Sequence, residues 1–128
     1  MKKAENIGFG RYGKSFQEGL TQLIYDDRPF ADQITEVLDI NFLELEYLRV
    51  FVNKIIEYRL KYSVHPSTQA VTTMLNTDLE KENEVIQRQV REYFRKIQYN
   101  ELSDIEYIKE QSLDFCKKQV LKQAMVKS

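Results

Sequence analysis

The stretch LEYLRVFVNKIIEYRLKY, residues 45 to 62, is the most apolar part of the chain and decides how its fold is interpreted. Its apolar residues recur at helical spacing and together cover well over half of a helix circumference: Leu48, Phe51, Val52, Ile55, Ile56 and Tyr62. A helix that is apolar on so many sides is packed on several of them. We therefore expect a central helix from about Leu43 to Tyr62 in an all-α fold.

Amphipathic stretches flank this central helix on both sides. Capping boxes, in which a Ser or Thr is followed three residues later by Glu, predict helix starts at Ser15, Thr77 and Ser103. Pro29 can open a further short helix, because the N–H that it lacks is not needed in a first helical turn. Another short helix follows Pro66, and no stretch alternates between apolar and polar residues as a strand would. We expect about six helices and no sheet.

The order of these helices suggests three parts. Residues 1–13 contain three of the four glycines and are expected to form a flexible arm. Residues 14–77 are expected to form a small helical globule. Residues 78–126 hold two long helices that are expected to pack together as a hairpin, with a tight turn near Asn100.

Composition limits the classes of protein to which the chain could belong. The 128 residues suffice for one domain with a core, and the single cysteine excludes an intramolecular disulfide. The net charge is −1 and 30% of the residues are charged, which argues against a nucleic-acid module built on a dense basic face. Neither a signal peptide nor an apolar stretch of the ~20 residues needed to span a membrane is found. The chain is expected to be cytoplasmic.

One short motif suggests nucleotide binding. GFGRYGKS, residues 8 to 15, fits the phosphate-binding pattern G-x-x-x-x-G-K-[ST]. A working phosphate loop hangs between a buried strand and a helix, but the residues before Gly8 are charged and polar. We therefore interpret the match as coincidental and expect no cofactor in this chain, neither ATP nor Mg²⁺.

The remaining candidates for chemistry are few, and none predicts a catalytic, cofactor-binding or metal site. His65 has no neighbouring His or Cys and is expected to have a loop or capping role. Cys116 lies on the apolar stripe of the last helix, where a free Cys behaves as a small hydrophobe. Three arginines share one helix face, which is either solvated among glutamates or docks an acidic partner or phosphates: Arg88, Arg91 and Arg95.

Aromatic and aliphatic residues in the two long helices extend beyond the stripe that each helix needs for its own packing. In a homo-oligomer such a surplus is buried where one hairpin meets a second copy across a two-fold axis. The residues expected at this interface are Tyr93, Tyr99, Tyr107, Phe115 and Leu121.

Three stretches resemble the N-terminal domain of the DnaB family of replicative hexameric helicases, in a divergent, phage-type version. The opening helix, from Leu20 to Asp26, is similar to the family's L-G-x-L-L-x-D, with Thr21 in place of the glycine. Residues 45–75 resemble its helix, proline-containing turn and short helix, with Val64 where the family has glycine. Residues 107–125, YIKEQSLDFCKKQVLKQAM, look like its Y-x-x-I-V-x-x-x-x-x-x-R-x-M helix.

The resemblance covers about residues 14–126 and implies a role in DNA replication. The family's N-terminal domain forms a collar, a trimer of dimers, that supports hexamer assembly and docks the primase or a helicase loader. A separate RecA-like motor domain hydrolyses ATP and unwinds DNA in the 5′→3′ direction. That motor is absent from this chain, so the chain itself is not expected to be an enzyme or to bind DNA.

A second hypothesis is a stand-alone helical adaptor or phage regulatory protein, which would use the same hairpin to bind a protein partner. A reading frame that continues into a strand followed by G-x-x-x-x-G-K-[ST] favours the helicase. One that ends at Ser128 favours the adaptor.

Overall fold

The structure, a computed structural model, describes residues 8–127, with side chains through residue 125. Over these residues the chain is all-helical and contains no strand. In chain order the elements are the 3₁₀-helix η1 (Gly10–Tyr12), α1 (Gly13–Asp26), α2 (Arg28–Ile34), the 3₁₀-helix η2 (Ile40–Phe42), α3 (Glu46–Tyr62), α4 (Thr68–Thr77), α5 (Glu84–Ile97) and α6 (Ile105–Lys127). The predicted fold class and the six α-helices are confirmed.

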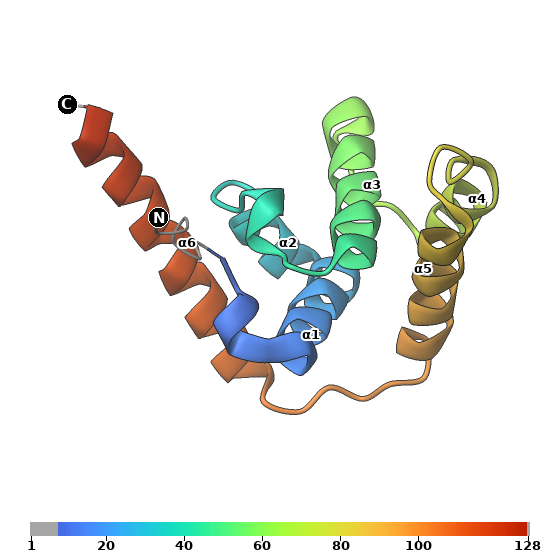
Figure 1. The fold of residues 1–128 in the computed structure, drawn as a ribbon, viewed down its shortest axis with the longest axis horizontal. Coiled ribbons are helices and arrows are strands. Elements are labelled where there is room, and N and C mark those ends of the chain that lie inside the picture. Colours follow the sequence, from blue (N-terminus) through green and yellow to red (C-terminus); the bar gives the residue numbers. More distant parts are fainter. Residues whose placement is uncertain (1–7, 128) are drawn as a thin grey trace.

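Helices α1 and α3 form the centre of the molecule (Figure 1). Helix α1 packs against α2, α3 and α6, while α3 packs against α1, α4 and α5. Five residues of α3 are buried, as the sequence predicts for a central helix: Tyr47, Leu48, Phe51, Val52 and Ile55. Nine of the 14 residues of α1 are buried as well, so the first helix is more enclosed than its sequence suggested.

Side-chain caps define several helix starts. Asp27 accepts a hydrogen bond from the Phe30 N–H at the start of α2, where Pro29 occupies the first turn as predicted. Asn83 accepts one from the Ile86 N–H and opens α5. The capping box at Thr77 is therefore wrong, since this residue ends α4 and its hydroxyl donates to the Thr73 carbonyl.

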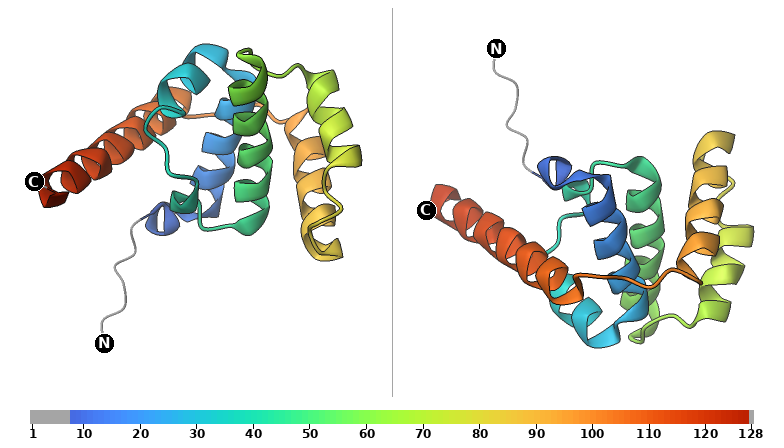
Figure 2. Two further views of the ribbon diagram at one scale, coloured as in Figure 1. Left: turned by 90° about the horizontal axis from the view of Figure 1, so that it is seen from above. Right: turned by 90° about the horizontal axis from the view of Figure 1, so that it is seen from below.

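The expected hairpin of the last two helices does not form. Helix α5 packs on α3, whereas α6 packs on α1 and α2, so the central pair α1–α3 lies between them (Figures 1 and 2). The connector 98–104 crosses α1 and is held there by two amide hydrogen bonds of 2.9 Å, from Gln22 to the Asn100 carbonyl and from the Asn100 side chain to Gln22. Each long helix thus buries its stripe against the globule, because the anchored connector keeps the two apart.

Part of the expected N-terminal arm belongs to the core. Phe9 is fully buried, its N–H donates to the Phe42 carbonyl, and its own carbonyl accepts a hydrogen bond from Gln17. Helix α1 begins at Gly13 rather than Ser15, and Glu18 contacts Tyr47 and Lys96 rather than closing a capping box. A flexible arm is therefore wrong for residues 8–13, and residues 1–7 lie outside the described residues.

No helix in the described part of the chain is both long enough and apolar enough to cross a membrane.

Candidate functional site

A half-open groove of about 990 Å³ lies along α1, between the C-terminal end of α5 and the first half of α6. The connector 98–104 bounds it at the Gln22 end of α1, and η1 bounds it at the other end. Its lining mixes aromatic, aliphatic and charged side chains, among them Tyr12, Phe16, Tyr93, Leu102, Tyr107 and Phe115. The groove thus separates α5 from α6, the two helices that were expected to pack together as a hairpin.

Gly19 sets the spacing at the floor of this groove. A Cβ atom there would lie 2.9 Å from Cδ1 of Ile108 and 3.4 Å from Cδ2 of Leu102. The missing side chain therefore lets α6 and the connector approach α1 closely, with Ile108 buried.

A polar network forms the wall of the groove where α1, α3 and α5 meet. The Glu18 carboxylate accepts hydrogen bonds from Lys96 at 2.8 Å and from the Tyr47 hydroxyl at 2.5 Å. The Tyr93 hydroxyl donates to the Glu18 carbonyl at 2.6 Å. Through Glu18, these bonds join α1, α3 and α5. The sequence pattern had assigned Glu18 to a capping box at the start of its own helix.

The ionisation of this network follows from its surroundings. Burial opposes the charge on Glu18, but the hydrogen bonds from Lys96 and Tyr47 and the nearby positive charges outweigh it, so the pKa of Glu18 is lowered. Burial and then the Glu18 carboxylate raise the pKa of Tyr47, and burial above all raises that of Tyr93. The network thus consists of one carboxylate, one ammonium and two neutral phenols.

Five aromatic rings close the other end of the groove. The Phe9 ring centroid lies 4.8 Å from that of Phe115, and Phe42 and Tyr12 lie 5.2 and 5.9 Å from Phe115. Phe16 completes the cluster, 5.7 Å from Phe9. Tilted and edge-on rings at such distances attract one another, so this cluster fixes the middle of α6 to the N-terminal segment.

The predicted interface residues fall into two groups. Tyr93 is only 3% exposed and belongs to the core, so its prediction as an interface residue is wrong. Phe115 is partly buried in the aromatic cluster. By contrast, Tyr99, Tyr107 and Leu121 are 86%, 58% and 61% exposed. Tyr93 was expected beyond the stripe that α5 needs for its own packing, but its ring packs against α3, with its centroid 5.5 Å from that of Phe51 and 6.0 Å from that of Tyr47.

The predicted basic face is divided in the same way. Arg91 donates to the Leu75 carbonyl at 3.1 Å and so ties α5 to the end of α4. Arg88 and Arg95 are exposed. Two of the three arginines therefore remain open to a partner.

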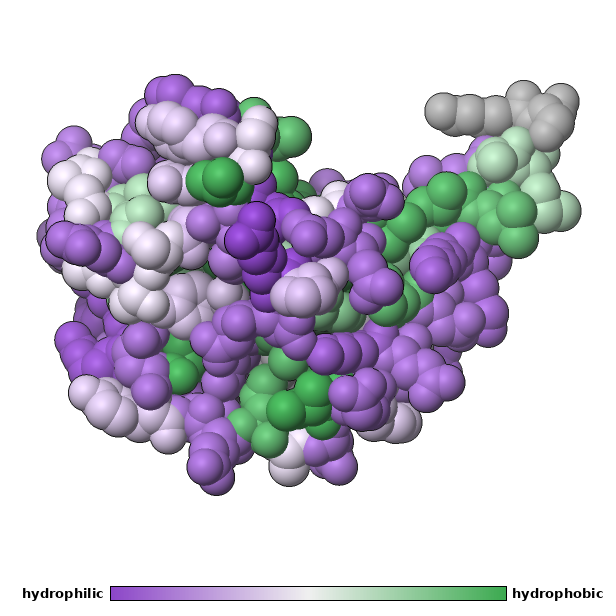
Figure 3. Space-filling model, turned by 180° about the vertical axis from the view of Figure 1, so that it is seen from behind, coloured by the Kyte–Doolittle hydropathy of each residue, from purple (hydrophilic) through white to green (hydrophobic). Residues whose placement is uncertain are grey.

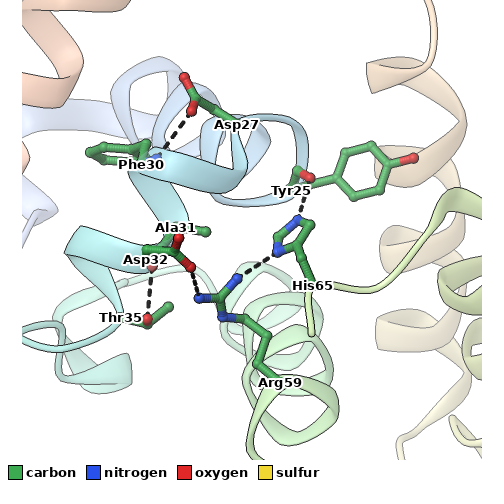
Figure 4. A network of polar contacts seen from close by, with 8 residues as sticks. All are labelled: Tyr25, Asp27, Phe30, Ala31, Asp32, Thr35, Arg59 and His65. Carbon is green, nitrogen blue, oxygen red and sulfur yellow. Dashed lines mark hydrogen bonds and ion pairs between the residues drawn. The ribbon is translucent and has the colours of Figure 1, made fainter. Parts of the chain in front are cut away.

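His65 joins the loop before α4 to three helices (Figure 4). Its Nε2 lies 2.8 Å from the Tyr25 carbonyl, and its Nδ1 lies 2.8 Å from a guanidinium nitrogen of Arg59, which also forms an ion pair with Asp32. Because arginine can only donate, Nδ1 is the acceptor and Nε2 carries the proton that it donates to Tyr25. His65 thus has the predicted loop role, as a neutral imidazole.

The remaining candidates in the described chain are a metal site, the thiol of Cys116 and the phosphate-loop look-alike. The described residues contain no cluster of three or more His, Cys, Asp or Glu side chains that could hold a metal ion. Cys116 is fully buried, and its burial raises the pKa of its thiol to about 12. The backbone N–H groups of Phe9, Tyr12 and Gly13, within the phosphate-loop look-alike, all donate to protein carbonyls.

Comparison of the chain with protein-family models, with curated proteins and with solved structures finds no match. The assignment of a function therefore depends on the groove, on α6 and on the sequence resemblance.

Proposed function

We propose that the chain is a helical self-association domain, and specifically the N-terminal collar domain of a replicative DNA helicase. The observation that carries this proposal is the shape and surface of α6. The helix leaves the globule partway along its length and projects from it (Figure 1).

Helix α6 carries apolar residues on two opposite sides. One side is buried against the globule and includes Ile108, Ser112 and Cys116. The other side carries the exposed residues Tyr107 and Leu121, fourteen residues apart, which is close to four helical turns. Hydrophobic residues follow the projecting part of the helix (Figure 3). A helix that is apolar on two sides needs two neighbours, and the globule supplies one.

A second copy of the chain fits the charges on α6. Glu106, Glu110 and Asp114 lie in its first half and outnumber Lys109 there, whereas Lys118 and Lys122 lie in its second half. Two such helices that pack antiparallel across a two-fold axis set the acidic half of each beside the basic half of the other.

The sequence resemblance supplies the biological role. In a DnaB-type helicase, domains of this kind assemble a collar on one side of a hexamer and dock the primase or a loader. ATP, Mg²⁺ and DNA would then be bound by a RecA-like motor domain outside this chain, in the cytoplasm of a bacterium or of a phage-infected cell.

A stand-alone adaptor or phage regulatory protein is the second candidate, favoured by the groove and its mixture of aromatic and charged lining residues. The two candidates are separated by the native reading frame. A RecA-like domain after Ser128 supports the helicase, and its absence supports the adaptor.

Self-association itself is tested by sedimentation of the chain over a range of concentrations. Burial of one exposed apolar side chain stabilises an interface by about 1.5–3 kcal/mol, and a two-fold axis repeats each contact. The double variant Tyr107→Ser with Leu121→Ser should therefore weaken dimerisation by roughly two decades or more in Kd, with its helical content retained.

Val85→Ser is the matched control, because Val85 is also an exposed apolar residue on a helix but lies on α5. It should leave dimerisation unchanged. A wild-type chain that sediments as a monomer at every concentration would contradict the proposal.

A further inference from the structure

We propose that the groove along α1 receives the projecting half of α6 from a second copy, with Lys122 of one copy beside Asp104 of the other. This inference rests on the self-association proposed above. It specifies the register of the two α6 helices and names the groove along α1 as the surface that α6 of the second copy contacts.

One side of α6 faces the groove. Tyr107 and Phe115 line the groove from α6, and Gln111 lies between them at helical spacing. The same stripe continues at the same spacing to Lys118 and Lys122, beyond the part of the helix that packs on the globule. The side of α6 that forms the groove wall is therefore also the side that the projecting half presents.

The connector end of the groove and the projecting half of α6 carry opposite charges. Glu101 and Asp104 lie at the connector end of the groove, are exposed, and form no ion pair within the described residues. Lys122 is likewise exposed without an ion pair there, whereas Lys118 pairs with Asp114 on its own helix at 3.1 Å.

The other charged residues of the groove leave its connector end acidic. Glu18 and Lys96 neutralise each other at 2.8 Å. Arg11 lies on η1, at the opposite end of the groove. The connector end thus carries unneutralised negative charge, which suits a lysine from a partner.

The positions of these charges along the chain set the register of the two α6 helices. Asp104 and Lys122 lie nine residues before and nine residues after Leu113. A two-fold axis at the level of residue 113, on the groove-facing side of an antiparallel pair of α6 helices, therefore brings Asp104 of each copy level with Lys122 of the other. The same axis sets Gln111 opposite Phe115, both partly buried residues of the groove-facing stripe. One axis thus satisfies the charge pairing and the groove contact together, twice in each dimer.

The inference is tested by charge reversal measured through sedimentation. Asp104→Lys and Lys122→Asp should each weaken dimerisation by about tenfold or more, because two attractive pairs become repulsive. A mixture of the two variants should restore wild-type affinity, since a mixed dimer has an Asp and a Lys in both pairs. Restoration on mixing is the result that supports the inference.

A second variant, Asp104→Asn, separates the loss of charge from a folding defect caused by lysine at position 104. Asp104 has a φ of 58°, which asparagine tolerates better than lysine, so Asp104→Asn removes the charge with less backbone strain. It should weaken dimerisation by a smaller factor than Asp104→Lys does.

The control is Lys117→Asp, which makes the same charge change on the same half of α6 but off the groove-facing stripe. It should have little effect. A dimer that resists the reversal at Asp104 and Lys122, or that responds equally to Lys117→Asp, overturns the groove inference and leaves self-association standing. A strictly monomeric wild-type chain overturns both.

Discussion

Replacement of Gln17 by Leu should destabilise the whole domain, although the glutamine is one polar residue among many. Gln17 is fully buried in α1. Its side-chain amide donates to the Phe9 carbonyl at 3.1 Å, and its side-chain oxygen accepts from the Glu44 N–H at 2.8 Å. One side chain therefore satisfies the backbone of the N-terminal segment and of the residues just before α3.

The magnitude follows from these two bonds. Leucine has a similar volume and fills most of the space, so the change leaves the buried Phe9 carbonyl and the partly buried Glu44 N–H without their partner and without a large cavity. An unsatisfied buried group costs about 1–3 kcal/mol, and the partly buried N–H costs about 1 kcal/mol, so Gln17→Leu should lower the free energy of unfolding by roughly 2–4 kcal/mol. At ~4 °C per kcal/mol for a domain of this size, Tm should fall by about 8–16 °C.

Urea unfolding followed by circular dichroism measures this change. Gln33→Leu is the matched control, because Gln33 is exposed on α2, and its variant should stay within about 0.5 kcal/mol of the wild type. If Gln17→Leu also stayed within that range, the two bridging hydrogen bonds would not hold the N-terminal segment, and the argument for its place in the core would fail.

Three further predictions concern the groove wall and the phosphate-loop look-alike. Tyr93→Phe should cost about 0.5–1.5 kcal/mol in urea unfolding, because the hydroxyl's bond to the Glu18 carbonyl is lost while the ring stays packed; no loss would mean that this bond contributes nothing. The pKa of Glu18 is lowered on folding, so the stability that its carboxylate contributes is present above its ordinary value of 4.5 and is lost as the pH falls through the folded value. Glu18→Gln should therefore show a weaker loss of stability than the wild type in acid unfolding below pH 4.5, and an equally steep loss would place the acid sensitivity elsewhere. Titration calorimetry with Mg-ATP should give the same absence of binding for the wild type and for Lys14→Ala, whereas micromolar binding that depends on Lys14 would show a working phosphate loop.

Much of the secondary structure was predictable because helices are specified by neighbouring residues. The stripe from Leu48 to Ile55 marks α3, and Pro29 opens α2, through patterns that lie within a few residues of one another. Capping was less predictable, because Glu18 has the spacing of a capping box yet contacts Tyr47, 29 residues away. The local spacing therefore allows a capping hydrogen bond, but the side chain can bond to a residue distant in the sequence instead.

The candidate site was only partly predictable for the same reason. The exposure of Tyr107 and Leu121 agrees with their positions off the buried stripe of α6, which the sequence contains. The burial of Tyr93 does not follow from its own helix, because its place depends on α3 and on the carbonyl of Glu18, 75 residues away. The groove was not predictable at all, since it exists only where α1, α5, α6 and the connector meet.

The sequence by itself determined that the chain is helical, where the central helix lies, and that α6 has apolar residues to spare. Only the tertiary structure decided that α5 and α6 lie on opposite sides of the central pair. The physical reason is that two antiparallel helices and two separated ones bury the same stripes, so the periodicity of the sequence does not distinguish them. The choice is made by contacts between residues distant in the chain, the amide pair of Gln22 with Asn100 and the close approach of Ile108 to Gly19.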